Sequence, residues 1–214
     1  MKLTIILIVL VIILGVGSYF LFFNKKESAS EEKISNMANL TGKKIVMIIA
    51  FRDFKDEEYF IPRGIFEKSG AEIKVASNEL GTAQGVDGGE VDVDMKTSAV
   101  NVSDFDAVVF IGGAGAPANL DNQDSYKIAQ DAVAQNKLLS AICISPAILA
   151  RAGVLNGKKA TVWTSALNKD AQKILEENGA IYQKDAVVQD GNIITGNGPE
   201  AAEQFAEKIL DVLK

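Results

Sequence analysis

The sequence predicts an α/β fold with a mainly parallel central sheet, preceded by one hydrophobic N-terminal helix. Three observations lead to this prediction. From residue 43 onward, short apolar runs alternate with segments of helical periodicity, which is typical of βαβ units. The apolar run 106–111 leads directly into two glycines, as a central strand does before a turn. The stretch 3–23 is apolar and contains no charged residue.

The first half of the domain opens with the run KIVMIIA at 44–50, which predicts a buried first strand. A helix is expected at 57–69, interrupted early by Pro62 and closed by Gly70. The further elements of this half are a strand at 72–77, a hairpin around Gly88-Gly89 within 81–102 and the central strand 106–111.

The second half continues the alternation with a helix at 126–135 and an apolar strand at 138–142. The sequence then predicts a helix at 146–152, a strand at 159–163, a helix at 171–178, two short strands within 186–195 and a closing helix at 201–213. Phe110 and Trp163, both on predicted strands, are expected in the core.

Composition excludes several classes of function. The 214 residues carry 22 Lys and Arg against 28 Asp and Glu, a net charge of −6, so a nucleic-acid partner is not expected. Histidine is absent and Cys143 is the one cysteine, which excludes Ser-His-Asp and Cys-His catalytic devices and an internal disulfide. No metal site and no cofactor are expected.

The N-terminal stretch 3–23 is long enough to cross a bilayer, because its 21 residues would span roughly 30 Å as a helix. A cleaved signal peptide is the alternative, but its apolar region is usually shorter and followed by a small-residue cleavage site. We therefore expect residues 1–23 to be a membrane anchor, 24–42 a polar linker and 43–214 the globular domain. The predicted location is a single-pass membrane protein whose domain lies outside the cytoplasm.

Cys143 stands between the apolar strand 138–142 and a segment whose first turn contains Pro146. A cysteine at such a strand-to-helix turn occupies a nucleophile elbow, where the helix N-terminus and free backbone amides favour a negative sulfur. The alternative is a small buried hydrophobic residue, which is how most free cysteines behave. The local sequence leaves both interpretations open.

Two further segments are expected at the same edge of the sheet. Gly112 and Gly113 follow the central strand and can present backbone amides, although a plain tight turn is also possible. Asp56, Glu57 and Glu58 follow the first strand near the start of a helix, where Asp56 is a reasonable N-cap and Glu57 a solvated acid. The residues alone do not decide whether Glu57 or Glu58 points inward.

Several blocks of the sequence resemble the ThiJ/PfpI family, which contains the parkinsonism-associated deglycase and the intracellular protease I type. The blocks occur in family order over nearly all of residues 43–214: the first strand, EEYFIPRGIFEKSGAEIKVAS, DFDAVVFIGG, AICISPAILARAGVLNGKKATVW and DGNIITGNGPEAAEQFA. The resemblance implies a flavodoxin-like α/β sandwich that is usually a homodimer.

The resemblance also implies roles for single residues. Cys143 matches the family's nucleophile, Glu58 its acidic partner, and Gly113 and Ile144 the amides that hold an oxyanion, with Gly112 supporting the loop. Because two adjacent negative groups cannot both ionise cheaply, we expect a proton on Glu58 and a thiolate on Cys143 near neutral pH. Protease-type members carry His where this chain has Ile144, so a Cys-His protease is not expected.

Two functions follow from this resemblance. The first is an enzyme in which Cys143 adds to a small reactive carbonyl, as in a glyoxalase or deglycase. The second is a non-enzymatic redox sensor or chaperone-like binder in which Cys143 is oxidised. The expected partners are a small carbonyl substrate or an oxidant, the membrane through residues 3–23, and a second copy of the chain.

Overall fold

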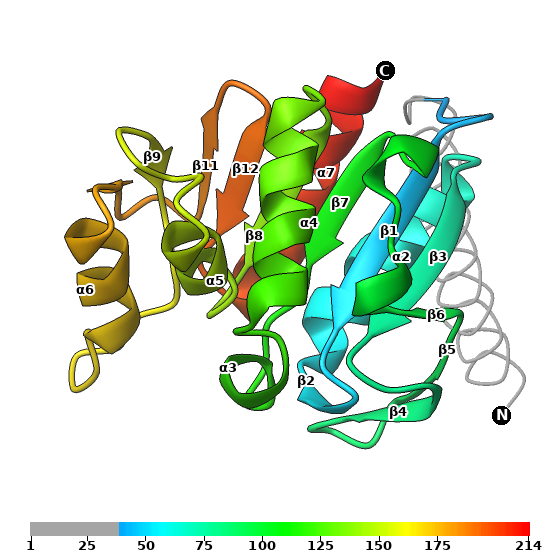
Figure 1. Ribbon diagram of the computed structural model, residues 1–214, viewed down its shortest axis with the longest axis horizontal. Helices are drawn as coiled ribbons and strands as arrows, with labels where there is room; N and C mark the ends of the chain where they lie inside the picture. The colour runs from blue at the N-terminus through cyan, green and yellow to red at the C-terminus, as the bar shows by residue number, and fades with distance from the viewer. Residues whose placement is uncertain (1–38) are drawn as a thin grey trace, which may run out of the picture. The chain divides into compact units, whose positions relative to one another are not determined.

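The computed structural model describes residues 39–214, which form one compact unit around a seven-stranded sheet (Figure 1). The strand order is β11-β12-β8-β7-β1-β3-β6, and all neighbours are parallel except the pair β11 and β12. The strands of this sheet are β1 (Lys44–Ile49), β3 (Glu72–Ser77), β6 (Met95–Lys96), β7 (Ala107–Phe110), β8 (Leu138–Ile142), β11 (Val187–Asp190) and β12 (Ile193–Gly196). The α/β fold with a mainly parallel central sheet is therefore confirmed.

Helices cover both faces of the sheet, which explains why its central strands β1, β7 and β8 are mainly apolar and almost entirely buried. On one face α2 (Asp56–Lys68) packs against α7 (Ala202–Leu213). The other face carries α4 (Gln123–Ala134) and α5 (Pro146–Arg151), with α6 (Asp170–Glu177) packed against α5. A short helix α3 (Ala116–Asn119) and 3₁₀ turns at Thr97–Ala99, Val102–Asp104 and Pro199–Ala201 complete the helical elements described.

Two small sheets lie outside the central one. The predicted hairpin is present as the antiparallel pair β4 (Gly81–Gly85) and β5 (Glu90–Val93), joined by β2 (Arg52–Phe54). The strand expected at 159–163 is shorter than predicted: β9 (Lys159–Ala160) pairs with β10 (Ile181–Tyr182) and does not join the central sheet. The backbone beyond it turns toward the end of β8, where the Trp163 N–H bonds the Cys143 carbonyl at 2.8 Å.

The N-terminal predictions need one correction. The predicted membrane helix, 3–23, lies outside the residues that the structure describes, and within residues 39–214 no helix is long and apolar enough to cross a bilayer. This finding contradicts the predicted location as a single-pass membrane protein. The structure also extends the domain into the predicted linker, because Leu40 is fully buried and its N–H bonds the Ser69 carbonyl at 2.7 Å.

Substitution of Ile48 tests how much the core contributes to the free energy of unfolding. Its side chain is fully buried in the main hydrophobic cluster, so Ile48→Ala removes buried volume that the surrounding sheet and helices cannot refill. We expect the free energy of unfolding, measured by urea denaturation, to fall by about 2–5 kcal/mol. Leu167→Ala, at a side chain that is 99% exposed, is the control and should change it by less than about 0.5 kcal/mol. A similar small loss in both variants would contradict the described core.

Candidate active site

Cys143 lies on a sharp turn between β8 and α5, as the elbow interpretation predicts. Its φ angle is +63°, a left-handed conformation that non-glycine residues rarely adopt. Hydrogen bonds hold this conformation: the Cys143 N–H donates to Gly196 O at 2.9 Å, and its carbonyl accepts from Trp163. Such backbone strain costs on the order of 1–3 kcal/mol and persists only where the surroundings enforce it. The turn therefore places the thiol at the carboxyl edge of the sheet.

A buried hydroxyl ties this elbow to the neighbouring strand. Ser145 is fully buried, and its Oγ donates to the Ile111 carbonyl at 2.8 Å, just beyond the end of β7. Because Ile111 precedes the two glycines, this bond links the cysteine turn to the glycine loop. Pro146 then starts α5 at a position where a missing N–H is tolerated.

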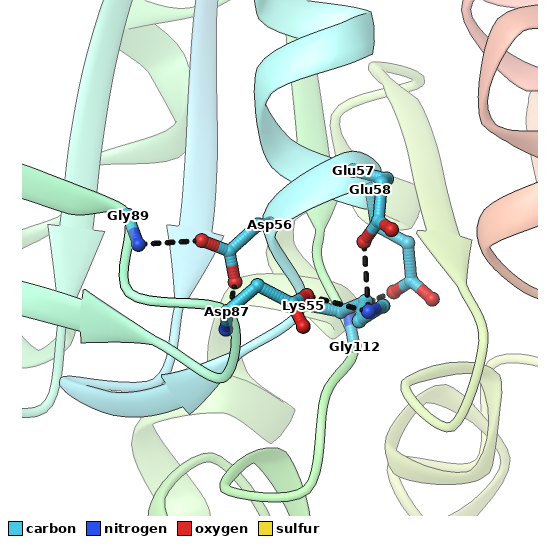
Figure 2. Close-up of polar contacts among 7 residues, drawn as sticks. All are labelled: Lys55, Asp56, Glu57, Glu58, Asp87, Gly89 and Gly112. Carbon is cyan, nitrogen blue, oxygen red and sulfur yellow. Dashed lines mark hydrogen bonds and ion pairs between the residues drawn. The ribbon is translucent and has the colours of Figure 1, made fainter.

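The structure shows which of the three adjacent carboxylates, Asp56, Glu57 and Glu58, points into the site. Glu58 is fully buried in the first turn of α2, and its Oε2 accepts the Gly112 N–H at 3.1 Å, whereas the Glu57 side chain is 49% exposed and pairs with Lys55 (Figure 2). The N-cap expected at Asp56 is wrong. Lys55 is the N-cap residue, and the Asp56 carboxylate instead binds backbone N–H groups of the loop between β4 and β5.

The glycine loop lets the thiol and the carboxyl approach each other. A Cβ on Gly112 would lie 2.6 Å from Cys143 Cβ and 2.7 Å from Glu58 Oε2, distances that atoms do not tolerate. Gly113 has φ +116°, and its Cβ would lie 2.4 Å from the Asp53 carbonyl oxygen. The two glycines are therefore needed both for the turn and for the space between the reactive groups.

The carboxyl and the thiol influence each other's ionisation. Burial raises the pKa of Glu58 from 4.5 to about 7, while hydrogen bonds from the Cys143 thiol and the Gly112 N–H partly offset that effect. Burial also raises the pKa of Cys143, and the nearby charge of Glu58 raises it further; the N–H groups of Gly113 and Ile144 act in the opposite direction. The pair therefore avoids carrying two negative charges.

The pair holds at least one proton near neutral pH, because burial raises the pKa of both groups and the charge of Glu58 raises that of the thiol further. The expected division of that proton, carried by Glu58 with a thiolate on Cys143, stays a prediction. In either division the carboxyl and the sulfur share the proton, so Glu58 can accept it from the thiol.

A cavity of about 400 Å³ opens over the thiol. Cys143, Glu58, Gly113 and Ile144 all line it, so four of the five predicted site residues share one pocket, and Gly112 lies between two of them. No group of three or more potential metal ligands occurs in the part of the chain that the structure describes. The site therefore combines a thiol, a buried carboxyl and two backbone N–H groups around a small cavity.

Sequence reasoning missed part of the cavity wall. Trp163 was expected in the core, but its side chain is 37% exposed and lines the cavity; that prediction is wrong. Lys55 and Val86 also line the cavity. Their role had no signal in the sequence, because Val86 lies in a hairpin loop whose position over the elbow depends on tertiary contacts.

The sequence profile of the DJ-1/PfpI family matches residues 43–212. The chain belongs to the DJ-1/PfpI family. An uncharacterised protein of Methanocaldococcus jannaschii is 39% identical over 186 residues, which are 86% of this chain and 88% of that protein. A deglycase of Pyrococcus horikoshii is 32% identical over 170 residues, 79% of this chain and 99% of its own. These matches confirm the resemblance to the ThiJ/PfpI family, which is the same family.

The solved structures of the DJ-1/PfpI family confirm the flavodoxin-like sandwich. A ThiJ/PfpI domain protein from Brachyspira murdochii is 33% identical and has a TM-score of 0.76, covering 80% of this chain and 98% of the other. Relatives in this family are named deglycases, which agrees with an enzyme.

The raised pKa of Glu58 predicts a measurable loss of stability with pH. The pKa of this carboxyl is about 7 in the folded protein and 4.5 in the unfolded chain. The carboxyl therefore stabilises the fold at low pH, and this stabilisation is lost as the pH rises through 7. Between pH 5 and 8, the free energy of unfolding of the wild type should fall by about 2 kcal/mol more than that of Glu58→Gln, measured by urea denaturation. Glu57→Gln, at the exposed neighbour, should behave as the wild type does. Equal pH dependence in Glu58→Gln and the wild type would contradict the assignment.

Proposed function

We propose that this protein is a cysteine-dependent enzyme acting on small reactive carbonyl compounds, of the glyoxalase or deglycase kind. The observation that carries the proposal is the contact of the Cys143 thiol with a buried carboxyl whose pKa is about 7, at the base of a cavity. A general base works best when its pKa lies near the working pH. Glu58 meets this requirement for the proton of the thiol.

The first step would be addition of Cys143 Sγ to the aldehyde carbon of a 2-oxoaldehyde. An S–C bond forms, the C=O π bond breaks, and the thiol proton passes through Glu58 to the new oxygen, which gives a hemithioacetal. The N–H groups of Gly113 and Ile144 already interact with the sulfur, and they would stabilise negative charge that develops on that oxygen.

The remaining steps need no redox partner. Glu58 would take the proton from the former aldehyde carbon and return it to the adjacent carbon, while the hydroxyl proton moves from the first oxygen to the second. The product is a 2-hydroxy thioester on Cys143. Water then cleaves the thioester, releasing a 2-hydroxy acid and restoring the thiol. The sum is addition of one water to the 2-oxoaldehyde, so the chain's own groups suffice. In the deglycase variant, the aldehyde carbon of the substrate already carries an amine or thiol. The S–C bond to Cys143 forms, the bond from that carbon to the amine or thiol breaks, and the leaving group takes the thiol proton, which gives the same hemithioacetal.

Turnover of methylglyoxal tests this function. The full chain should consume methylglyoxal and form lactate, followed by NMR, and Cys143→Ser should abolish the reaction. Glu58→Gln should lower kcat/KM by a factor of about 10²–10⁴, and the wild-type rate should rise with pH through about 7 as Glu58 ionises. Glu72→Gln, at the exposed first residue of β3, is the control and should keep the wild-type rate. Equal turnover by wild type and Cys143→Ser would exclude the mechanism.

A second candidate function is oxidation of Cys143 as a redox sensor. The favouring observation is that Gly113 and Ile144 direct N–H groups at the sulfur while Glu58, when protonated, can donate to an oxygen bound there. Two equivalents of peroxide would supply two oxygens and leave as water, giving a sulfinate. Ready gain of two oxygens by intact mass, without any carbonyl turnover, would favour the sensor over the enzyme.

A further inference from the structure

The loop 85–89, between β4 and β5, folds around a single carboxylate. Asp56 is 9% exposed, and its two oxygens accept the N–H groups of Asp87 at 2.9 Å and Gly89 at 2.7 Å (Figure 2). A Cβ on Gly85 or Gly89 would lie 2.3 or 2.4 Å from a carboxylate oxygen of Asp56. The loop therefore surrounds Asp56 so closely that glycine is required on both sides.

Two more contacts attach the same loop to the start of α2. Lys55 Nζ lies 2.6 Å from Asp87 Oδ2 and 2.8 Å from Glu57 Oε2. The Val86 N–H donates to the Phe54 carbonyl at 2.9 Å. The loop is thus held by three consecutive residues, 54–56, that lie only two to four positions before Glu58.

These contacts bring Val86 to the active cavity. Val86 lies between the anchored residues Gly85 and Asp87; it is 49% exposed and forms part of the cavity wall. The wall continues with the apolar side chains of Ala114, Pro117, Ile144, Trp163 and Pro199. A substituent on a carbonyl carbon bound to Cys143 would therefore meet hydrocarbon on several sides.

The charged groups of the cavity do not favour an anionic substituent. Apart from Cys143, the ionisable side chains among the cavity residues described are Lys55 and Glu58. The Lys55 ammonium is already matched by two carboxylates, and Glu58 adds negative charge when it ionises. An anion entering the cavity would lose water without gaining an unpaired cation, whereas an apolar group would gain from burial.

We propose that Asp56 is a positioning residue that holds loop 85–89 so that Val86 completes an apolar wall over Cys143. The cavity therefore selects carbonyl compounds with an apolar alkyl or aryl substituent over those with an anionic one. The reaction itself rests on the proposed function, but the selection belongs to the cavity and can be measured without turnover.

Alkylation of Cys143 provides that measurement, because the chain has one cysteine. The full chain is treated with N-benzyliodoacetamide, iodoacetamide or iodoacetate, in which Sγ displaces iodide, and each rate is divided by the rate with N-acetylcysteine at the same pH. Intact mass follows the reaction. We expect the normalised rate to be about tenfold higher for the benzyl reagent than for iodoacetamide, and lowest for iodoacetate. Equal normalised rates for the benzyl reagent and iodoacetate would overturn the proposal.

Variants distinguish loss of the position of Val86 from a general loss of folding. Asp56→Ala and the isosteric Val86→Thr should each reduce the benzyl-to-iodoacetamide ratio at least threefold, and Asp56→Asn, which keeps one acceptor oxygen, should retain part of it. Asp124→Ala, at an exposed first-turn acid of α4, is the matched control and should keep the wild-type ratio. Val86 is half exposed, so Val86→Thr is expected to fold even if Asp56→Ala does not. An unchanged ratio in Val86→Thr would overturn the proposal.

Turnover distinguishes failure of this inference from failure of the proposed function. If the enzyme acts on 2-oxoaldehydes, kcat/KM should be higher for phenylglyoxal than for glyoxal, and Asp56→Asn should raise KM for phenylglyoxal more than it lowers kcat. Turnover without this preference would keep the proposed function and overturn the selection. A benzyl preference in alkylation without any turnover would support the selection and overturn the proposed function.

Discussion

The close approach of the Glu58 carboxyl to the Cys143 thiol is the contact on which the site depends. It needs three separate parts of the chain: the first turn of α2, the glycine loop after β7 and the turn after β8. Gly112 makes the contact possible, because any side chain there would occupy the space between the two groups. The parallel sheet brings the three parts together, since the carboxyl ends of β1, β7 and β8 meet at one edge.

Burial of this contact sets its chemistry. Glu58 is fully buried and Cys143 is half-buried, so both groups resist ionisation, and the charge of Glu58 raises the pKa of the thiol further. The result is a carboxyl and a thiol that do not both ionise near neutral pH. The burial that raises the pKa of Glu58 also reduces the stability of the fold at higher pH.

The start of α2 serves two purposes at once. Glu58 points into the site, while Lys55 and Asp56 hold the loop that forms part of the cavity wall (Figure 2). Three adjacent carboxylates therefore have three different environments: Asp56 binds backbone amides, Glu57 pairs with Lys55 at the surface and Glu58 is buried. The sequence DEE alone does not distinguish these three environments, because each depends on what the fold places opposite the side chain.

The sequence by itself determined the α/β alternation and placed Cys143 and the two glycines directly after strands, because these features depend on local periodicity and on how a strand ends. It left open whether Cys143 is a nucleophile or a small buried hydrophobic residue. The family resemblance supplied Glu58 as the partner of Cys143. Only the tertiary structure decided that Asp56 binds a loop rather than capping its helix, that Trp163 lines the cavity, and that Glu58 rather than Glu57 is buried beside the thiol. These outcomes depend on burial and on contacts between residues distant in the chain, which local sequence patterns do not encode.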